Sequence, residues 1–325
     1  MGGFDVRHNP VRQIVQSVTA AFLLVAVPFA NRAAAGATSP GLRGPANAGF
    51  ASKSMGRLVT GSMVSLDGIS LLVPPPGGGV WGAAARVDGS RRTVGLQTSP
   101  DGKVMVYETW LGGASGGADT GGSEPATSLS NCSDSAYKLE GSAKWHSTWT
   151  WYFNVGSTPS EVHQDKATSA LRDAAGNITG AHNDCGLPDN VNAHHAYKGT
   201  TSKSANIGTN SSCKSSDGTS VVDFGDLALA DLGFACYWTQ GSSVVEGDMR
   251  LNKADYSWVV IIGDGCVTKY SVEDAATHEF GHIFGLADLS ASLHPNLTMS
   301  AVMLPCQNSQ TSLGLGDVKG LEAQY

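Results

Sequence analysis

The sequence predicts an α/β (α+β) fold, in which a mixed, twisted sheet carries helices and follows a smaller β-rich segment. Three observations predict this class. Strand patterns dominate residues 38–111. Aromatic side chains then alternate along residues 145–153, ahead of a helical pattern. Further strand patterns precede a helix that begins after Ser271 and ends near Gly285, giving a strand–helix–strands–helix order.

Residues 1–37 have the pattern of a secretory signal peptide. Arg7 and Arg12 precede an apolar run over residues 18–30, and the small residues at 33–37 offer a cleavage site. The run is short for a bilayer span. We therefore expect a secreted protein with no membrane contact in its mature form. A retained N-terminal anchor is the alternative, because Arg32 follows the run almost directly.

Charge and cysteine content agree with export. The formal net charge is −7 and no basic cluster is present, which argues against a nucleic-acid partner. An even number of cysteines in an exported chain predicts three disulfides. Zinc binding by these residues is disfavoured, because no C-x-x-C spacing occurs. The candidates are Cys132, Cys185, Cys213, Cys236, Cys266 and Cys306.

The composition divides the mature chain into two unequal parts. Strand patterns at 58–64, 69–73 and 103–110, with a hairpin turn at 99–102, indicate a β-rich first part over residues 38–111. Residues 112–131 form a Gly/Ser-rich linker. The first part is either a propeptide or an accessory segment, and residues 132–325 form the second domain.

The second domain begins with a strand whose alternating aromatic residues we assign to the core. A helix is then expected from Thr158, with Pro159 at its first position, Glu161 completing a capping box and Gly176 ending it. More strands are expected at residues 221–224, 232–238, 244–251 and 258–262.

The segment 277–288 carries the chemistry and reads H-E-x-x-H-x-x-G-x-x-D from His278. On a helix, His278 and His282 leave the same face, so both can bind one zinc ion. Glu279 lies beside them as the general base for a zinc-activated water. Gly285 can end the helix in a left-handed conformation and bring Asp288 in as third ligand. Three ligands and one open position are typical of catalytic zinc.

Two alternatives to this site remain open. The segment could be an ordinary amphipathic core helix whose histidines only satisfy hydrogen bonds. His294 could also replace Asp288 as the third ligand, since it lies sixteen residues beyond His278. We favour Asp288, although its shorter side chain requires the backbone to pass nearer the metal.

These residues resemble the metzincin clan of zinc endopeptidases. Residues 300–305 resemble a matrixin Met-turn, and residues 315–325 resemble a matrixin terminal helix. Asp288 in place of histidine is similar to the snapalysin type of secreted bacterial protease. The resemblance implies a metzincin-like mixed sheet with a zinc helix and a hydrophobic floor from Met303, with Met299 as alternative. It also implies an edge strand, at 234–238 or 244–251, that pairs with an extended substrate.

Two further patterns are weaker. Cys185 begins a C-G-L-P-D sequence that resembles the matrixin cysteine switch, but the lead-in differs, and we favour a disulfide. Asp223, Asp226 and Asp231 could hold a structural calcium ion, although their spacing does not match a calcium loop. Among the disulfide candidates, pairing of Cys266 with Cys306 is attractive, because it would tie the approach to the zinc helix to the segment after Met303.

The sequence therefore predicts a secreted zinc-dependent endopeptidase, with Glu279 as catalytic base and His278, His282 and Asp288 as metal ligands. Its partner would be a protein or peptide substrate, and we expect a monomer. The alternative is a catalytically inactive exported binding or cell-wall protein that keeps the metzincin fold.

Overall fold

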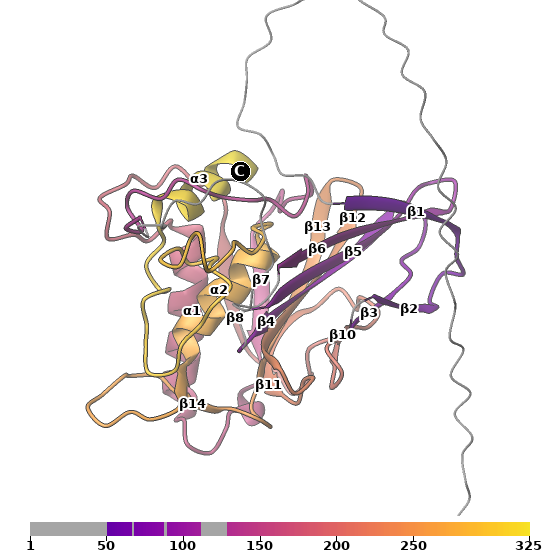
Figure 1. The fold of residues 1–325 in the computed structure, drawn as a ribbon. Helices are drawn as coiled ribbons and strands as arrows, with labels where there is room; N and C mark the ends of the chain where they lie inside the picture. Colours follow the sequence, from indigo (N-terminus) through magenta and orange to yellow (C-terminus); the bar gives the residue numbers. More distant parts are fainter. Residues whose placement is uncertain (1–50, 67, 88–89, 112–128) are drawn as a thin grey trace, which may run out of the picture. The chain divides into compact units, whose positions relative to one another are not determined.

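The computed structural model describes residues 51–66, 68–87, 90–111 and 129–325 of the 325-residue chain (Figure 1). These residues belong to one unit, which spans residues 47–325. The predicted signal peptide and residues 112–128 of the predicted linker lie outside the described residues. Within the described ranges, every helix is too short or too polar to cross a membrane.

The strands predicted at 69–73, 103–110, 221–224, 232–238 and 244–251 correspond to observed strands, whereas the strand predicted at 58–64 is wrong over residues 58–62. The helices are η1 (Val155–Ser157, a 3-10 helix), α1 (Gln164–Thr179), α2 (Val272–Ile283) and α3 (Leu315–Gln324). The N-terminal strands are β1 (Ala51–Arg57), β2 (Met63–Leu66), β3 (Ile69–Leu72), β4 (Gly78–Arg86), β5 (Arg91–Thr98) and β6 (Lys103–Leu111). The later strands are β7 (Trp149–Phe153), β8 (His195–Thr200), β9 (Ile207–Gly208), β10 (Ser212–Cys213), β11 (Ser220–Gly225), β12 (Asp231–Gln240), β13 (Ser243–Asn252), β14 (Ser257–Val259) and β15 (Lys269–Ser271).

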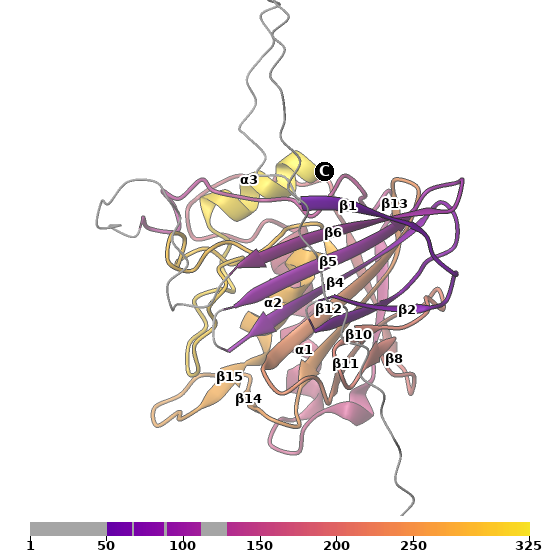
Figure 2. The same ribbon diagram turned by 45° about the vertical axis from the view of Figure 1, so that its right-hand side comes forward.

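A large mixed sheet organises the described residues. Its nine strands run in the order β1-β6-β5-β4-β12-β13-β11-β7-β8, and Figure 2 shows β6, β5, β4 and β12 side by side. The neighbours β13, β11, β7 and β8 pair in parallel, whereas β12 is antiparallel to both β13 and β4. The predicted mixed α+β class is confirmed at this level.

The β-rich first part of the chain belongs to the same sheet as the second domain. Strand β4 pairs with β12 along nearly its whole length, and β5, β6 and β1 continue the sheet beyond it. The predicted hairpin turn at 99–102 joins β5 to β6, with Gly102 at φ +82°. The remaining strands β2 and β3 pair with β10 and β9 in a separate four-stranded sheet. Whether this part is a propeptide or an accessory segment stays a prediction.

Two apolar cores lie on opposite faces of the main sheet. The helix-side core lies between the sheet and helices α1 and α2, and it contains Trp149, Trp151 and Phe153 of β7, each fully buried. The predicted assignment of these aromatic residues to the core is confirmed. The back-side core lies between the main and small sheets, and it includes Phe234 and Trp238 of β12. Alternation along β12 sends successive side chains to the two cores.

The two main helices differ in how well their starts were predicted. Helix α2 has Ser271 as its N-cap, as predicted, and the Ser271 side chain accepts a hydrogen bond from the Asp274 amide. The predicted start of α1 at Thr158 is wrong, because the helix begins at Gln164 and runs past Gly176 to Thr179. The Glu161 carboxylate accepts the Trp258 amide at 3.3 Å, so it holds β14 where a capping box was expected.

All six cysteines form disulfides. The pairs are Cys132–Cys185, Cys213–Cys236 and Cys266–Cys306. The expected number of disulfides and the Cys266–Cys306 pair are confirmed, and Cys185 is part of a disulfide. The Cys213–Cys236 bond ties β10 of the small sheet to β12 of the main sheet.

We predict that Gly95→Ala destabilises the fold by about 1–3 kcal/mol, because it overpacks a filled core position. The Trp81 ring occupies the space that a Cβ at Gly95 would need, and it is held between Tyr107 and Tyr237 at centroid distances of 5.2 and 6.0 Å. Gly176→Ala is the control, since nothing lies within 4 Å of its Cβ position. It should be neutral or stabilising by up to about 1 kcal/mol. Denaturant unfolding measures both, and equal stability of the two variants would contradict the prediction.

Candidate metal centre

Helix α2 brings two histidines to one point. Their spacing of four residues places both rings on the same helix face. The Nε2 atoms of His278 and His282 are 3.2 Å apart, and both side chains are fully buried. Phe280 lies between them in sequence and packs edge-on against Trp149 of β7, at a centroid distance of 5.1 Å. The helix is therefore fixed against the sheet by its aromatic contacts.

The turn after α2 brings a carboxylate to the same point. Gly285 has φ +88°, the left-handed conformation expected from the sequence, and the Leu286 amide bonds back to the Gly281 carbonyl at 2.9 Å. The Asp288 Oδ1 atom then lies 3.1 Å from His278 Nε2 and 3.6 Å from His282 Nε2. Within the described part of the chain, this is the group of His, Cys, Asp or Glu side chains whose ligand atoms converge closely enough to hold a metal ion.

The tautomers of the histidines direct lone pairs at this point. The Nδ1–H of His278 donates to the Thr298 carbonyl at 2.8 Å, and that of His282 donates to the Leu286 carbonyl at 2.9 Å. Since a carbonyl can only accept, each Nδ1 carries the hydrogen, and each neutral ring presents an unprotonated Nε2. These two lone pairs and the Asp288 carboxylate attract a cation.

The separations of the three atoms fit a zinc ion. Donors about 2.0–2.1 Å from zinc at tetrahedral angles lie roughly 3.3–3.4 Å from one another. The three separations here are 3.1, 3.2 and 3.6 Å. In the absence of metal, burial lowers the pKa of His282, but the Asp288 and Glu140 carboxylates outweigh burial and raise it well above its usual value. A proton and a metal ion therefore compete for the same electron pair.

A second layer of contacts fixes the acceptor of His278. The Asp317 carboxylate of α3 accepts the amides of Thr298 at 2.8 Å and Met299 at 3.1 Å. Burial raises the pKa of Asp317 to about 6, although these hydrogen bonds oppose the shift. The terminal helix thereby positions the loop whose carbonyl orients the His278 ring.

Both methionines considered for the floor of the site are buried in the helix-side core. The Met299 thioether lies against Gly281, on the helix surface between the two histidines in sequence. Met303 is 3 % exposed in the same core. The role of Met303 as the hydrophobic floor stays a prediction, and the position of Met299 against α2 supports the alternative.

Glu279 lies fully buried between α2 and β12. Its carboxylate packs on the backbone of Gly233, where an added Cβ would be 2.5 Å from Oε1. A glycine at this position therefore makes room for the side chain of the expected catalytic base. Nothing in the sequence pattern of β12 singled out Gly233, because its importance arises only when the strand meets the helix.

Several weaker candidates lie elsewhere. His294 bonds to Asp134 at 2.8 Å and is outside the metal-binding group, so the structure does not favour it as third ligand. Two of the three aspartates considered for calcium are held by arginines: Asp223 pairs with Arg250 at 2.6 Å, and Asp231 pairs with Arg86 at 2.7 Å. These ion pairs give no support to a calcium site.

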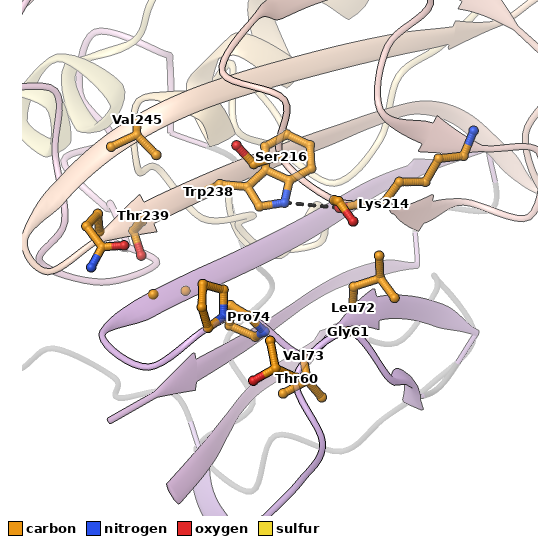
Figure 3. Close-up of a pocket in the computed structure, with 15 residues that line it drawn as sticks. Thr60, Gly61, Leu72, Val73, Pro74, Lys214, Ser216, Trp238, Thr239 and Val245 are labelled. Atoms are coloured by element: carbon orange, nitrogen blue, oxygen red, sulfur yellow. Dashed lines mark hydrogen bonds between the residues drawn. The ribbon is translucent and has the colours of Figure 1, made fainter. Parts of the chain in front are cut away.

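The expectation of an edge strand beside the site is wrong. Both candidates, β12 and β13, lie inside the sheet, and β4 occupies the position next to β12. A cavity of about 280 Å³ lies near the far end of β12, lined by Trp238, Pro74 and others (Figure 3). Its single charged lining residue is Lys214. That cavity contains none of the metal-binding group.

Two charged residues at the site, Glu140 and Lys138, carry no signal in the sequence patterns. Glu140 Oε1 lies 2.9 Å from His282 Nδ1 and is fully buried. The half-buried Lys138 interacts electrostatically with Asp288 and Glu140, although burial lowers its pKa. The Lys138 carbonyl accepts the Ala287 amide at 2.8 Å, so this segment runs alongside the turn that leads to Asp288. Because the segment with Lys138 and Glu140 lies about 140 residues from the motif, no local spacing in the sequence could have placed these two residues at the site.

Comparison with known proteins adds no assignment: neither the family models nor the curated proteins include a match to this chain.

We predict that Gly285→Ala weakens zinc binding roughly 5–30-fold, since a left-handed residue with a Cβ costs about 1–2 kcal/mol. The new Cβ would also lie 2.9 Å from Gln324 Nε2. Gly61→Ala is the matched control, because Gly61 has φ +80° but nothing within 4 Å of its Cβ position. Both variants should lose stability, and only Gly285→Ala should lose affinity in a chelator competition assay. Unchanged zinc affinity in Gly285→Ala would contradict this account of the turn.

Proposed function

We propose that the chain is a secreted, zinc-dependent endopeptidase of metzincin type. The observation that carries the proposal is the convergence of His278 Nε2, His282 Nε2 and Asp288 Oδ1 on the helix that presents Glu279. Two imidazoles and one carboxylate form a known catalytic zinc ligation, which leaves a further coordination position for reactants. Three disulfides support export to an oxidising compartment.

The residues divide the catalytic work between them. A zinc ion bound here would polarise the peptide carbonyl and acidify water. His278, His282 and Asp288 would hold that ion. Glu279 accepts a proton from the attacking water and returns it to the leaving amine, which is the role of a general acid–base. Asp288 would add negative charge that a third imidazole would not, so a zinc ion held here would be a weaker Lewis acid than one held by three histidines.

We expect Glu279→Ala to bind zinc at the wild-type stoichiometry and to lose casein hydrolysis by a factor of about 10²–10⁴, because the proton acceptor is removed while the ligands stay. Glu273→Gln is the control from the same helix. The Glu273 carboxylate accepts a hydrogen bond from the side-chain amide of Asn177 at 3.1 Å, on the face of α2 that packs against α1. Hydrolysis by Glu279→Ala at the wild-type rate would refute the assigned role.

The same assay series separates the two candidate third ligands. Asp288→Ala should lose zinc, whereas His294→Ala should keep it, because His294 is engaged with Asp134. Retention of zinc by Asp288→Ala together with its loss in His294→Ala would reverse the ligand assignment.

A substrate that reached this site along β12 would have to displace the first part of the chain. Strand β4 lies beside β12, with Ala85 opposite Gly233 and Ala83 opposite Ala235. Gly233 is the residue on which Glu279 packs. An extended substrate that paired with β12 would need the hydrogen-bonding edge that β4 occupies. We therefore propose that the segment containing β4 keeps the site closed.

If so, cutting the chain between β6 and residue 129 and separating residues 51–111 should raise peptide hydrolysis at least about tenfold, because only the open form binds substrate. A specific protease recognition sequence inserted within residues 112–123 allows the cut. Size-exclusion chromatography reports whether the segment has left, and the same cut in Glu279→Ala controls for contaminating protease. Equal rates for the uncut chain and the separated form would disprove closure by β4.

The full burial of the site also favours the second candidate function. His278, Glu279 and His282 are each fully buried, which suits a binding protein that keeps zinc for structure. In that case the separated form would retain zinc and show no hydrolysis. An inactive, zinc-loaded, open form would therefore decide for the exported binding protein.

A further inference from the structure

Glu140 reaches the metal centre from a segment that has no part in the zinc motif. The segment runs antiparallel to the turn after α2, with Leu139 opposite Leu286 and the Glu140 amide bonded to the Gly285 carbonyl at 2.9 Å. This pairing directs the Glu140 side chain at His282 from outside the helix. The carboxylate is 1 % exposed, so solvent contributes almost nothing to its stabilisation.

Several elements hold this carboxylate in place. Oε1 lies 2.9 Å from His282 Nδ1, and the Thr93 hydroxyl of β5 donates to the same oxygen at 3.4 Å. Burial raises the pKa of Glu140, although the contact with His282 opposes that rise. The nearby Tyr237 side chain of β12 also favours the charged form of Glu140 and so lowers its pKa. The sheet and the helix thus meet at this side chain.

The contact of Glu140 with His282 is not needed to satisfy the hydrogen bond of the His282 Nδ1–H. The Leu286 carbonyl already accepts from His282 Nδ1 at 2.9 Å, so the ring has a partner without Glu140. The Nδ1 of His278 is bonded to a backbone carbonyl, that of Thr298. Taking a carboxylate out of water carries a large desolvation penalty. Glu140 is thus a second acceptor for His282, and its burial is unfavourable. We therefore expect it to have a role beyond packing.

We infer that Glu140 is a positioning residue, which fixes the His282 ring and strengthens its Nε2 as a metal donor. This inference rests on the proposed zinc site. A carboxylate that accepts from Nδ1–H orients the imidazole and raises its basicity toward the metal. Leu286 lies in the turn that carries Asp288, so its carbonyl moves with the turn. Glu140 supplies a second restraint on the ring, from a segment outside the motif.

The test is Glu140→Gln, which keeps the size of the side chain and removes its charge. We expect zinc affinity, measured by chelator competition, to fall about 10–100-fold. Loading with Co²⁺ gives a second readout, because its visible absorption bands depend on ligand geometry and should shift in the variant. Glu140→Asp keeps the charge but shortens the side chain, and it should give an intermediate affinity.

Glu246→Gln is the matched control. Glu246 of β13 is as fully buried as Glu140, and its carboxylate is hydrogen-bonded to Ser216, the Gly218 amide and Asn206. It lies outside the metal-binding group. This variant should lose stability to a similar extent, measured by thermal unfolding, while zinc affinity and the Co²⁺ spectrum stay at wild-type values.

The outcomes separate the inference from the function on which it rests. Wild-type affinity and an unchanged Co²⁺ spectrum in Glu140→Gln would overturn the positioning role while leaving the zinc site intact. Equal losses of affinity in Glu140→Gln and Glu246→Gln would overturn it too, because they would reflect loss of stability alone. Should Glu140→Gln not fold, an unchanged affinity and spectrum in Glu140→Asp would overturn it. A wild-type chain that takes up neither metal would refute the zinc site, and this inference with it.

Discussion

Two imidazole nitrogens and a carboxylate oxygen face one another in the interior, and the rest of the site depends on a positive charge among them. The lone pairs of His278 and His282 meet at 3.2 Å, which is repulsive unless a proton or a metal ion lies between them. Glu279, Asp288 and Glu140 add three acidic groups in the same region, each buried. A divalent cation would offset two of these charges. Without a cation, burying these ionised carboxylates would cost several kcal/mol for each carboxylate.

The fold meets this constraint by fixing the donors from opposite sides. Helix α2 is anchored to β7 through Phe280 and Trp149, and its closing turn depends on the left-handed Gly285. On the other side, the segment at Glu140 pairs with that turn, and Asp317 of α3 holds the loop that orients His278. These supports come from separate elements, and the turn after α2 links two of the donors, because it carries Asp288 and supplies the Leu286 carbonyl that His282 bonds to.

The sequence alone was sufficient for the parts of the site that are local. The histidine spacing, the Ser271 cap, the Gly285 turn and the approach of Asp288 all depend on residues within one helix and its ends. Disulfide number followed from composition. The position of Glu140 could not be derived, because it depends on a pairing between segments about 140 residues apart. The same applies to Gly233, which matters only because β12 crosses Glu279.

The errors have a common physical cause. Thr158 and Pro159 carry a valid helix-start pattern, but Glu161 is used by the Trp258 amide, so the helix begins later. The prediction that β12 is an edge strand is wrong for a similar reason. Its neighbour β4 lies about 150 residues earlier in the chain, so the pairing leaves no local signal in the sequence. In both cases a long-range partner overrode a local preference.

The attachment of the N-terminal strands is uneven, and this bears on how the site could open. On the helix side, Ala83 and Ala85 of β4 lie opposite Ala235 and Gly233, so small side chains make the contact nearest Glu279. On the back side, large residues interlock, with Phe234 and Trp238 packed among the apolar residues of β3, β4 and β5. Exposing each such side chain costs roughly 1.5–3 kcal/mol. The contact nearest Glu279 is therefore made by small side chains, but Trp81 of β4 stacks on Tyr237 of β12 farther along the same face. Separation of the segment from β12 must expose this aromatic pair as well as the back-side core.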